Sequence, residues 1–494
     1  MTTSLAPVLL PVGMLTAAVV ATVAGSWRAE AGRVVGVVAT AGTIALAGVG
    51  LARSLDEGPL RHSVGGWAEP VGIEYVLDPL SGLFAVLIGV IGLLVVLYPP
   101  KMGFNAEPQR GVPYHGLVLI LLGGLLGVAM AGDLFNLFVF LEIYSIASYA
   151  LIALGGAKAA LASFRYLILA TVGSSFYLLG VGFTYFLTGN LGMAITAEAL
   201  PPLVDSNTLA AAAVLLTVGL AIKMAAFPFH VWLPGAHSQA PPAVAALLAA
   251  VQVKVAAYAL MRVVFDVLPP GYVSERIDLL TLLMWFSAGG IVVGSVMAVR
   301  QHDIKAMLAH STVAQIGYIG IGIGIGTRTA LVGALLHVLA HAMMKGTLFF
   351  AAGAIIDRAD TKEIGRFAGL GARMPLTMAG FTVAAISMVG LPPTAGFFSK
   401  FYLVTGAADG GHWVPAAIIV VSSLLTLAYV LRALETIWFT PGASPTALAA
   451  VREAPALALV PIGVLAVGTL VFGVGSFSLV NEVLDPAVTQ LIGP

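Results

Sequence analysis

Residues 134–144 read LFNLFVFLEIY, an apolar run that contains a single acid, Glu142. The run belongs to a longer apolar stretch, 133–154, and about 20 such residues suffice for a transmembrane helix. Of the 494 residues, 59% are hydrophobic and 9% are charged, against roughly 25% charged in soluble domains. This composition excludes a water-soluble globule, and the length of the apolar runs excludes a barrel of alternating polarity. The sequence therefore predicts an all-α polytopic membrane protein.

Charge and cysteine content exclude several further classes. Lys+Arg and Asp+Glu are both 23, so no positive excess is available to attract nucleic acid. The chain has no cysteine, which excludes disulfides, iron–sulfur clusters and thiolate metal sites. No Walker-type G-x-x-x-x-G-K-[ST] sequence is present. We therefore expect no cofactor, no metal and no nucleic-acid partner.

A scan for runs long enough to cross a bilayer predicts about fourteen transmembrane segments. The first segment lacks the positive region of a cleavable signal peptide, so we expect it to be retained. The predicted segments are 4–25, 33–53, 79–98, 114–131, 133–154, 163–188, 208–228, 241–266, 279–299, 304–326, 330–356, 374–408, 413–439 and 456–480.

Lys and Arg in the short loops predict the orientation, because cytoplasmic loops carry an excess of both. With the N-terminus outside, the inner loops hold Arg28, Arg33, Lys101, Arg110, Lys158, Arg165, Arg300, Lys305, Arg358, Lys362, Arg366, Arg373 and Arg452. The outer loops then hold only Arg53, Arg61, Arg262, Arg276 and Arg328. This asymmetry favours both termini outside and an even number of helices.

Proline interrupts two of the apolar runs, at Pro228 and at Pro392-Pro393. Non-helical backbone at membrane depth is tolerated only where protein or a wet cavity surrounds it. The two interruptions lie five segments apart, and broken helices at corresponding places are typical of inverted repeats in transporters. We therefore predict four parts, although two unrelated kinks would leave the same trace. They are helices 1–3 (1–113), a first five-helix repeat (114–266), a second, inverted repeat (279–439) and helix 14 (456–494).

Four ionisable residues lie well inside the predicted segments: Glu142, Lys223, Lys254 and Lys400. At about 2.5–3.5 kcal/mol each for a charge at a helix centre, they cost on the order of 10 kcal/mol unless paired or hydrated. Each alone could be a buried ion pair that only fixes helix packing. One acid and three lysines spread over four helices, two of them broken, favour a proton relay instead.

His337, His341 and Lys345 are spaced i, i+4, i+8 and so share one face of a helix. Two histidines at i, i+4 could ligate zinc, but no H-E-x-x-H acid and no evident third ligand accompany them. Histidine gains and loses a proton near neutral pH, which suits a relay. Ordinary packing hydrogen bonds are the alternative for all three.

Other polar residues are candidates for accessory roles. His310, followed at helical spacing by Ser311, Gln315 and Tyr318, makes its helix polar enough to hold water. Arg432 and Glu435 are i, i+3 neighbours, which indicates a local salt bridge or an exit funnel.

Three further polar residues lie near the predicted ends of helices. His230 and His237 fall in an inner connection, where we expect solvated histidines. Asp133 is expected to cap a helix at the outer surface.

Several motifs together resemble one known family. Lys223-x-x-x-Phe227-Pro228-x-His230, Leu233-Pro234-Gly235-Ala236-His237-x-x-Ala240-Pro241 and His341-Ala342-x-x-Lys345-Gly346-x-Leu348-Phe349 resemble the antiporter-like subunits of respiratory complex I and of the multisubunit Mrp Na+/H+ antiporters. The resemblance covers about 78–440. The run from Gly132 to Glu142, and Pro-Gly-Ala at 234–236, look most like the D-type Mrp subunits.

The resemblance implies a fold, a function and roles for individual residues. Glu142 and Lys223 would be the paired acid and base of a first half-channel, and Lys254 the central relay. The histidines would bridge to Lys400, where several complex I subunits carry Glu.

By the same resemblance, the chain would be a proton-translocating subunit of a cation/proton antiporter in the cell membrane. Its expected partners are other antiporter subunits, and its cargo is H+ together with Na+ or another monovalent cation, without enzymatic activity of its own. The alternative is a proton-pumping subunit of a complex I or a membrane-bound hydrogenase. A self-contained metabolite transporter and a structural scaffold are the rival classes. Transport by the isolated chain would favour the former, and transport unaffected by loss of Glu142 or Lys223 would favour the latter.

Overall fold

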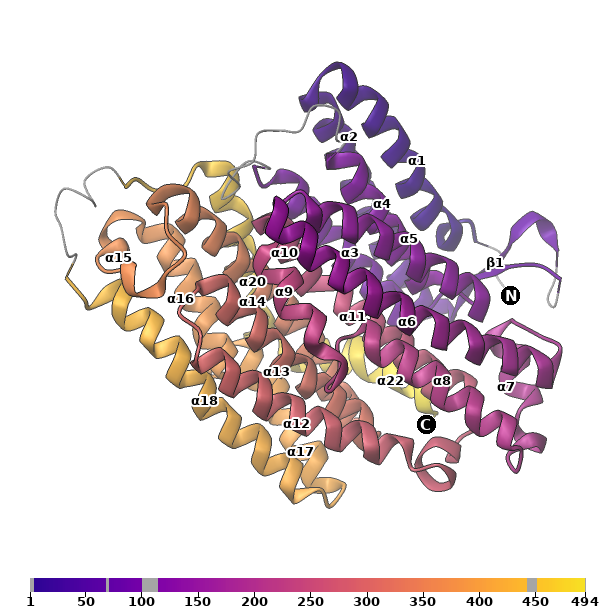
Figure 1. The fold of residues 1–494 in the computed structure, drawn as a ribbon. Helices are drawn as coiled ribbons and strands as arrows, with labels where there is room; N and C mark the ends of the chain where they lie inside the picture. The colour runs from indigo at the N-terminus through magenta and orange to yellow at the C-terminus, as the bar shows by residue number, and fades with distance from the viewer. Residues whose placement is uncertain (1–3, 68–70, 100–113, 442–450, 494) are drawn as a thin grey trace.

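The computed structural model describes residues 4–67, 71–99, 114–441 and 451–493, most of which lie in long helices (Figure 1). Lys101 and Arg110, which contribute to the predicted orientation, lie outside the described residues. Stretches of the predicted N-terminal part, 1–113, do so as well.

The N-terminal part comprises three helices and a short hairpin: α1 (Ala6–Trp27), α2 (Ala29–Glu57), β1 (Leu60–Ser63), η1 (Val64–Gly66), β2 (Glu74–Leu77) and α3 (Pro79–Leu97). The two strands pair antiparallel, with Leu60 opposite Leu77. Asp78 begins α3 as its N-cap, where its carboxylate accepts a 2.8 Å hydrogen bond from the backbone N–H of Ser81. In Figure 1, α1 and α2 lie along one side of the bundle.

The next part contains the first interrupted helix. Its elements are α4 (Tyr114–Met130), α5 (Leu134–Ala153), α6 (Ala157–Thr188), α7 (Met193–Ala199), η2 (Pro201–Leu203), α8 (Asn207–Lys223), η3 (Phe229–Val231), α9 (Trp232–Gln239), α10 (Pro242–Leu247), η4 (Leu248–Gln252), α11 (Val253–Met261), η5 (Arg262–Val267) and η6 (Tyr272–Arg276). The elements from α10 to η5 form one continuous helix, in which η4 and η5 are wider, π-helical turns.

The third part contains the second interrupted helix and the centre of the bundle. Its elements are α12 (Leu279–Val299), α13 (Ile304–Ile325), α14 (Arg328–Ala359), η7 (Ile364–Arg366), α15 (Leu370–Arg373), α16 (Pro375–Val389), α17 (Ala395–Asp409) and α18 (Trp413–Trp438). Every residue of α14 from Ala330 to Ile355 is buried, so this helix lies at the centre rather than against lipid.

The C-terminal part packs back onto the bundle. It consists of α20 (Ala456–Val474), α21 (Ser476–Leu479), η8 (Val480–Leu484) and α22 (Asp485–Ile492). Arg328, at the start of α14, pairs with Asp485 at 2.6 Å and ties α22 to the centre of the bundle.

Each predicted segment overlaps a described helix, and both predicted interruptions are present. In the first, α8 ends at Lys223 and the next helical turn begins at Phe229; in the second, α16 ends at Val389 and α17 begins at Ala395. Lys223 therefore ends its helix rather than lying inside a longer one. The helix predicted over 374–408 is two helices.

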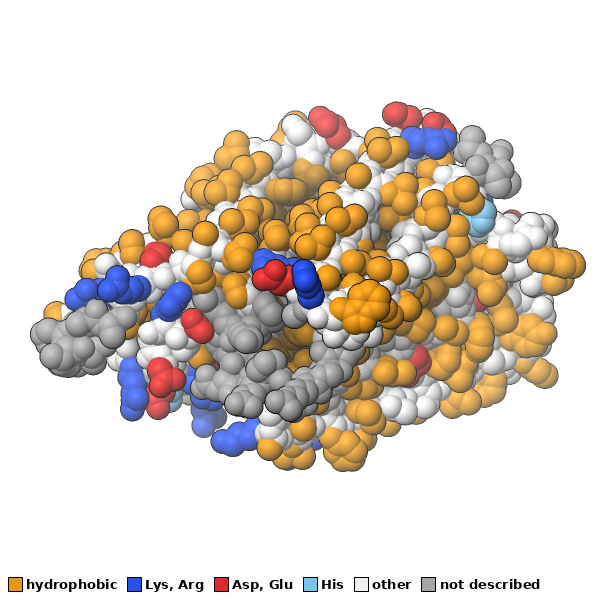
Figure 2. All heavy atoms as spheres, turned by 90° about the horizontal axis from the view of Figure 1, so that it is seen from above, with side chains coloured by type: hydrophobic (Ala, Val, Ile, Leu, Met, Phe, Trp, Pro, Cys, Tyr) orange, Lys and Arg blue, Asp and Glu red, His pale blue; other side chains and the backbone are white. Residues whose placement is uncertain are grey.

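The helices have the length and surface expected of a polytopic membrane protein. Within the described ranges, eleven helices are long and apolar enough to cross a membrane, and three shorter apolar helices accompany them: Tyr114–Met130, Asn207–Lys223 and Pro375–Val389. Hydrophobic side chains cover most of the face shown in Figure 2, where charged side chains form small groups. The prediction of an all-α polytopic membrane protein is confirmed, whereas the count of about fourteen segments stays a prediction.

Two of the cations expected in loops are buried in the bundle. Lys305, expected in an inner loop, lies in α13 and is 7% exposed. Arg262, expected in an outer loop, lies in the helical turn η5 and is 9% exposed. The apolar run that ends at 266 does not reveal the burial of Arg262, because its partner Asp78 lies far away in the sequence.

Candidate functional site

Glu142 and Lys223 form an ion pair between α5 and the end of α8. The Lys223 Nζ lies 3.1 Å from the Glu142 Oε1, and the exposed fractions of the Lys223 and Glu142 side chains are 1% and 29%. Ser174 on α6 donates a hydrogen bond to the same carboxylate oxygen, and Lys223 donates to the Ser145 hydroxyl at 2.9 Å. Because Lys223 is the last residue of α8, its charge also lies at the negative end of that helix dipole.

A polar network lies between this pair and the next lysine. The Ser148 hydroxyl donates to the Gln252 side-chain oxygen at 2.7 Å, and the Gln252 amide donates to the Tyr166 hydroxyl at 2.5 Å. Gln252 is 1% exposed and stands two residues before Lys254. The network thus joins α5, α6 and η4 through side chains that can accept and donate hydrogen bonds.

Lys254 is fully buried at the start of α11. Its Nζ donates to the backbone carbonyl of Ala249 in the π-helical turn η4. A π-helical turn disturbs the regular backbone ladder, which frees a carbonyl for a side-chain donor. No carboxylate pairs with Lys254 within the described residues, so backbone dipoles stabilise its charge.

Lys345 is the second fully buried lysine in the centre. Its Nζ donates to the Leu308 carbonyl at 2.7 Å and to the Ser311 hydroxyl, both on α13. Lys254 and Lys345 are both fully buried in the centre of the bundle, where like charges disfavour each other.

His337 and His341 continue along the same face of α14. Their rings stack with centroids 5.9 Å apart, and both side chains are fully buried. The His337 Nδ1 lies 2.9 Å from the Ser399 hydroxyl on α17. In the part of the chain that the structure describes, the other His337 nitrogen and both nitrogens of His341 have no hydrogen-bond partner. Three ring nitrogens are therefore available to mobile protons or water.

Lys400 occupies the second interruption. Its Nζ donates 3.0 Å hydrogen bonds to the carbonyls of Met388 and Val389 and to the Ser423 hydroxyl. The two carbonyls belong to the end of α16, where backbone acceptors lack intrahelical partners. The Tyr318 ring lies 4.9 Å from this Nζ and 5.2 Å from the His337 ring, so it links the lysine with the histidines.

The polar residues that we considered for accessory roles lie in two different places. His310 and His230 are partly buried and interact electrostatically with each other, whereas Ser311 and Tyr318 face Lys345 and Lys400. The polar residues of α13 therefore serve two faces rather than one.

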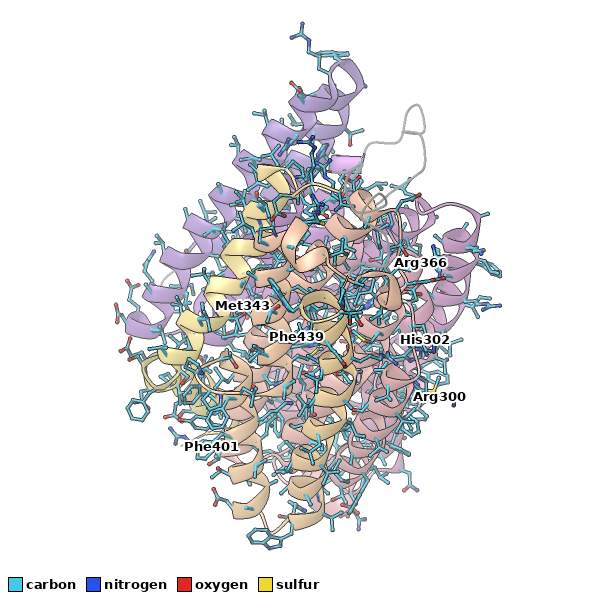
Figure 3. All side chains as sticks on the ribbon, turned by 90° about the vertical axis from the view of Figure 1, so that its left-hand side faces the viewer. Arg300, His302, Met343, Arg366, Phe401 and Phe439 are labelled. Atoms are coloured by element: carbon cyan, nitrogen blue, oxygen red, sulfur yellow. The ribbon has the colours of Figure 1, made fainter. Side chains whose placement is uncertain are left out.

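The expected Arg432–Glu435 salt bridge is not formed among the described residues. Arg432 donates instead to the carbonyls of Val299, at 3.0 Å, and of Gln301, while Glu435 is exposed. These acceptors adjoin Arg300 and His302 in the sequence, and both of these residues lie toward one edge of the molecule in Figure 3. Free carbonyls at the end of α12 outcompete a neighbouring carboxylate that remains in contact with solvent.

His237, which we expected to be solvated, is instead 0% exposed. Neither of its ring nitrogens has a hydrogen-bond partner among the described residues. It interacts electrostatically with Lys254 and Lys345. His237 lies in α9, the short helix that follows the first interruption and packs into the bundle, and its place between two apolar runs does not reveal this. Asp133 is confirmed as a cap, since its carboxylate accepts a 2.6 Å hydrogen bond from the backbone N–H of Asn136.

Seven of the predicted residues lie one after another through the bundle and form the line referred to below: Glu142, Lys223, Lys254, Lys345, His341, His337 and Lys400. Arg432 and Glu435 lie outside this line. The sequence pattern did not identify Ser145, Ser174, Gln252 and Ser399, which connect the charged groups. Serine is common in membrane helices, so only the long-range contacts distinguish the three serines, whereas Gln252 is a polar side chain in an apolar run and could have been identified from the sequence. Within the described ranges, no group of three or more His, Asp or Glu side chains is arranged to hold a metal ion.

Comparison with known proteins identifies the family. The family model described as NADH:quinone oxidoreductase/Mrp antiporter, TM, matches residues 131–426, more than half of the chain. The chain belongs to this family. Differently named members of the family can be aligned over nearly the whole length of this chain. The chain is 46% identical to the N subunit of the NADH-quinone oxidoreductase of Desulforudis audaxviator, over 90% of this chain and 91% of that protein.

Antiporter members of the family are similar as well. The chain is 31% identical to the D-type subunit of the Na(+)/H(+) antiporter of Bacillus subtilis, over 94% of this chain and 92% of that protein. A chain of the solved Mrp complex from Dietzia sp. DQ12-45-1b superposes with a TM-score of 0.89 at 27% identity, covering 99% of this chain and 97% of that one. The chain is thus an antiporter-like membrane subunit of the Mrp or complex I type.

Proposed function

We propose that this chain is the proton-translocating subunit of a multisubunit cation/proton antiporter in the plasma membrane. The observation that carries the proposal is the Glu142–Lys223 pair, 3.1 Å apart at the beginning of a line of buried lysines and histidines. The 31% identity to the D-type subunit of an Na(+)/H(+) antiporter supports Na+ as the exchanged cation and other antiporter subunits as partners.

In the proposed mechanism, a proton moves by the protonation and release of successive bases. An ionised Glu142 favours the charged form of Lys223, and separation of the pair favours release of the proton toward Gln252 and Lys254. Since Lys254 and Lys345 are both fully buried in the centre of the bundle, arrival of a proton on one promotes its release from the other. Water and the free ring nitrogens of His341 and His337 carry the proton onward to Lys400.

We further propose the predicted inverted repeat, 114–266 and 279–439, with both termini outside. The supporting feature is the location of Lys223 and Lys400 at the two interrupted helices. The N-terminal part, 1–113, and the C-terminal part, 456–494, then lie outside the two repeats and flank them in the sequence.

Replacement of Lys254 by alanine tests the function. We expect proton-coupled transport by the purified assembly in vesicles to be lost, because the replacement removes the cation that lies between the two halves. Assembly, measured on a native gel, should be retained. His62→Ala, in β1, is the control and should transport normally. Loss of assembly with no separate effect on transport would support the scaffold instead.

A second candidate is the proton-pumping membrane subunit of a complex I-type oxidoreductase. It is favoured by the 46% identity to the N subunit of an NADH-quinone oxidoreductase. In that case the chain takes part in an oxidoreductase although it carries only the proton route. Mass spectrometry of the complex, purified in mild detergent, decides between the two, since quinone-oxidoreductase subunits in it would overturn the antiporter assignment.

A further inference from the structure

A charged pocket lies at the end of the bundle near the hairpin, outside the line of proton-carrying residues. Its volume is about 210 Å³, and its lining includes Arg61, Glu74, Asp78, Tyr258, Arg262 and Asp266. In the proposed orientation, the pocket opens to the outer side.

Arg262 lines the pocket, and three side-chain contacts hold it in place. Its guanidinium bonds to the Asp78 carboxylate and, at 2.6 Å, to that of Asp266, while its Nε donates to the Tyr258 hydroxyl at 3.0 Å. The exposed fractions of the Arg262 and Asp78 side chains are 11% and 4%. Asp78 is itself fixed as the N-cap of α3. The guanidinium is therefore held in place from two directions.

Tyr258 connects this arrangement to Lys254. Lys254, Tyr258 and Arg262 are spaced i, i+4, i+8 on one face of the same helix, so about 12 Å of helix separates the first from the last. The Tyr258 hydroxyl donates to the Ala129 carbonyl at the end of α4, at 2.6 Å. The Lys254 amine points the other way, toward the Ala249 carbonyl. A packed tyrosine and a paired arginine thus lie between the pocket and Lys254.

We propose that Arg262 is an outer seal of the proton route, which keeps protons on Lys254 from exchanging with the water of the pocket. This proposal rests on the proposed function. A guanidinium is protonated at all accessible pH values and offers only donors, so it cannot accept a proton and pass it on. Its fixed positive charge also repels cations, as arginines do in selective pores. Asp78 and Asp266 allow this charge to remain buried.

Removal of Arg262 should convert the seal into a path. Arg262→Gln leaves two carboxylates in the lining of the pocket without their counter-charge, which favours uptake of protons and water there. The purified assembly is reconstituted in vesicles with a pH-sensitive dye, and passive proton flux is driven by a potassium diffusion potential without Na+. We expect the flux through Arg262→Gln to rise on the order of tenfold over the unaltered assembly.

Two further variants decide how the leak arises. Arg276→Gln is the matched control, because it removes an exposed arginine whose pair with Asp205 spans 3.2 Å, and its flux should equal that of the unaltered assembly. In the double variant Arg262→Gln, Lys254→Ala, the added flux should disappear, because the path ends at Lys254. An added flux that persists without Lys254 would overturn the proposal.

The remaining outcomes are also decisive. An assembled Arg262→Gln variant without added flux would overturn the seal. If this variant does not assemble, Tyr258→Phe decides, since it removes only the hydroxyl that joins Arg262 to α4: added flux supports the seal, and unchanged flux overturns it. Normal antiport by Lys254→Ala alone would instead refute the proposed function, whereas loss of antiport there with no leak from Arg262→Gln refutes the seal only.

Discussion

Replacement of Glu142 by glutamine removes the carboxylate from the Lys223 ion pair and keeps nearly the same shape. At the observed 3.1 Å, the attraction of two unit charges is roughly 5 kcal/mol at an effective dielectric constant near 20, and about 1 kcal/mol in water. Lys223 is 1% exposed, so the larger value is closer, although the 29% exposure of Glu142 reduces it. Roughly 5 kcal/mol changes a protonation equilibrium by three to four powers of ten.

We expect Glu142→Gln to reduce coupled antiport at least about tenfold, since a loss of only about 1.4 kcal/mol has that effect on a rate. Glu142→Asp should retain part of the activity, because the charge remains at a shorter reach. The assay is cation-driven proton movement in inside-out vesicles that contain the complete assembly. Glu57→Gln is the control, because it breaks an exposed pair with Arg53 at 2.8 Å and should transport normally.

A double-mutant cycle determines whether the two residues act as one switch. Glu142→Asp and Lys223→Arg are measured singly and together, since these conservative changes leave activity from which a further loss can be detected. Coupled residues should show an interaction energy of about 0.5–3 kcal/mol. Losses that add within about 0.3 kcal/mol, with normal assembly, would refute the reasoning that the pair titrates as a unit.

Three further predictions concern topology, the connecting network and the second interruption. Single cysteines at Ser63 and Thr361 in this cysteine-free chain should react with an impermeant reagent from opposite sides of the membrane; reaction from the same side contradicts the proposed orientation. Gln252→Leu should assemble but slow proton transfer at least several-fold, because its hydrogen bonds to Ser148 and Tyr166 are lost, and an unchanged rate of dye response contradicts a role for the network. Lys400→Met should abolish antiport and destabilise the assembly by about 1–3 kcal/mol in thermal unfolding, since the carbonyls that Lys400 caps are left unpaired; unchanged stability and antiport contradict both roles.

The positions of the helices follow from the sequence because the membrane requires long apolar runs with internally satisfied backbone. The prolines at 228 and 392–393 likewise predict both interruptions, since proline lacks the N–H that a helix needs. The sequence is less informative about where a broken helix ends. The first half-helix ends at Lys223, well before Pro228, and turns through Ala225 with a positive φ of 59°.

The charged residues of the site are predictable for a related reason. A lysine or a glutamate in an apolar run is costly, so its presence alone identifies it as a candidate. Their partners are not predictable in this way. Lys254 bonds to a carbonyl released by a π-helical turn, and nothing in its neighbouring residues distinguishes that turn from a regular helix. The burial of Arg262 and His237 depends on segments distant in the sequence, so their neighbouring residues do not predict it.

The number of buried lysines that have a carboxylate partner limits how many protons the line can hold. Of the four buried lysines in the line, Lys223, Lys254, Lys345 and Lys400, only Lys223 has a carboxylate partner among the ion pairs of the described residues. The other three depend on backbone carbonyls and hydroxyls, which offer dipoles but no counter-charge. Four protonated lysines would therefore leave three uncompensated charges in a medium of low dielectric constant, at a cost far above that of releasing a proton. In the proposed mechanism, the line therefore holds only part of its proton capacity at any time, and a proton that enters at the Glu142–Lys223 end is matched by one that leaves farther along.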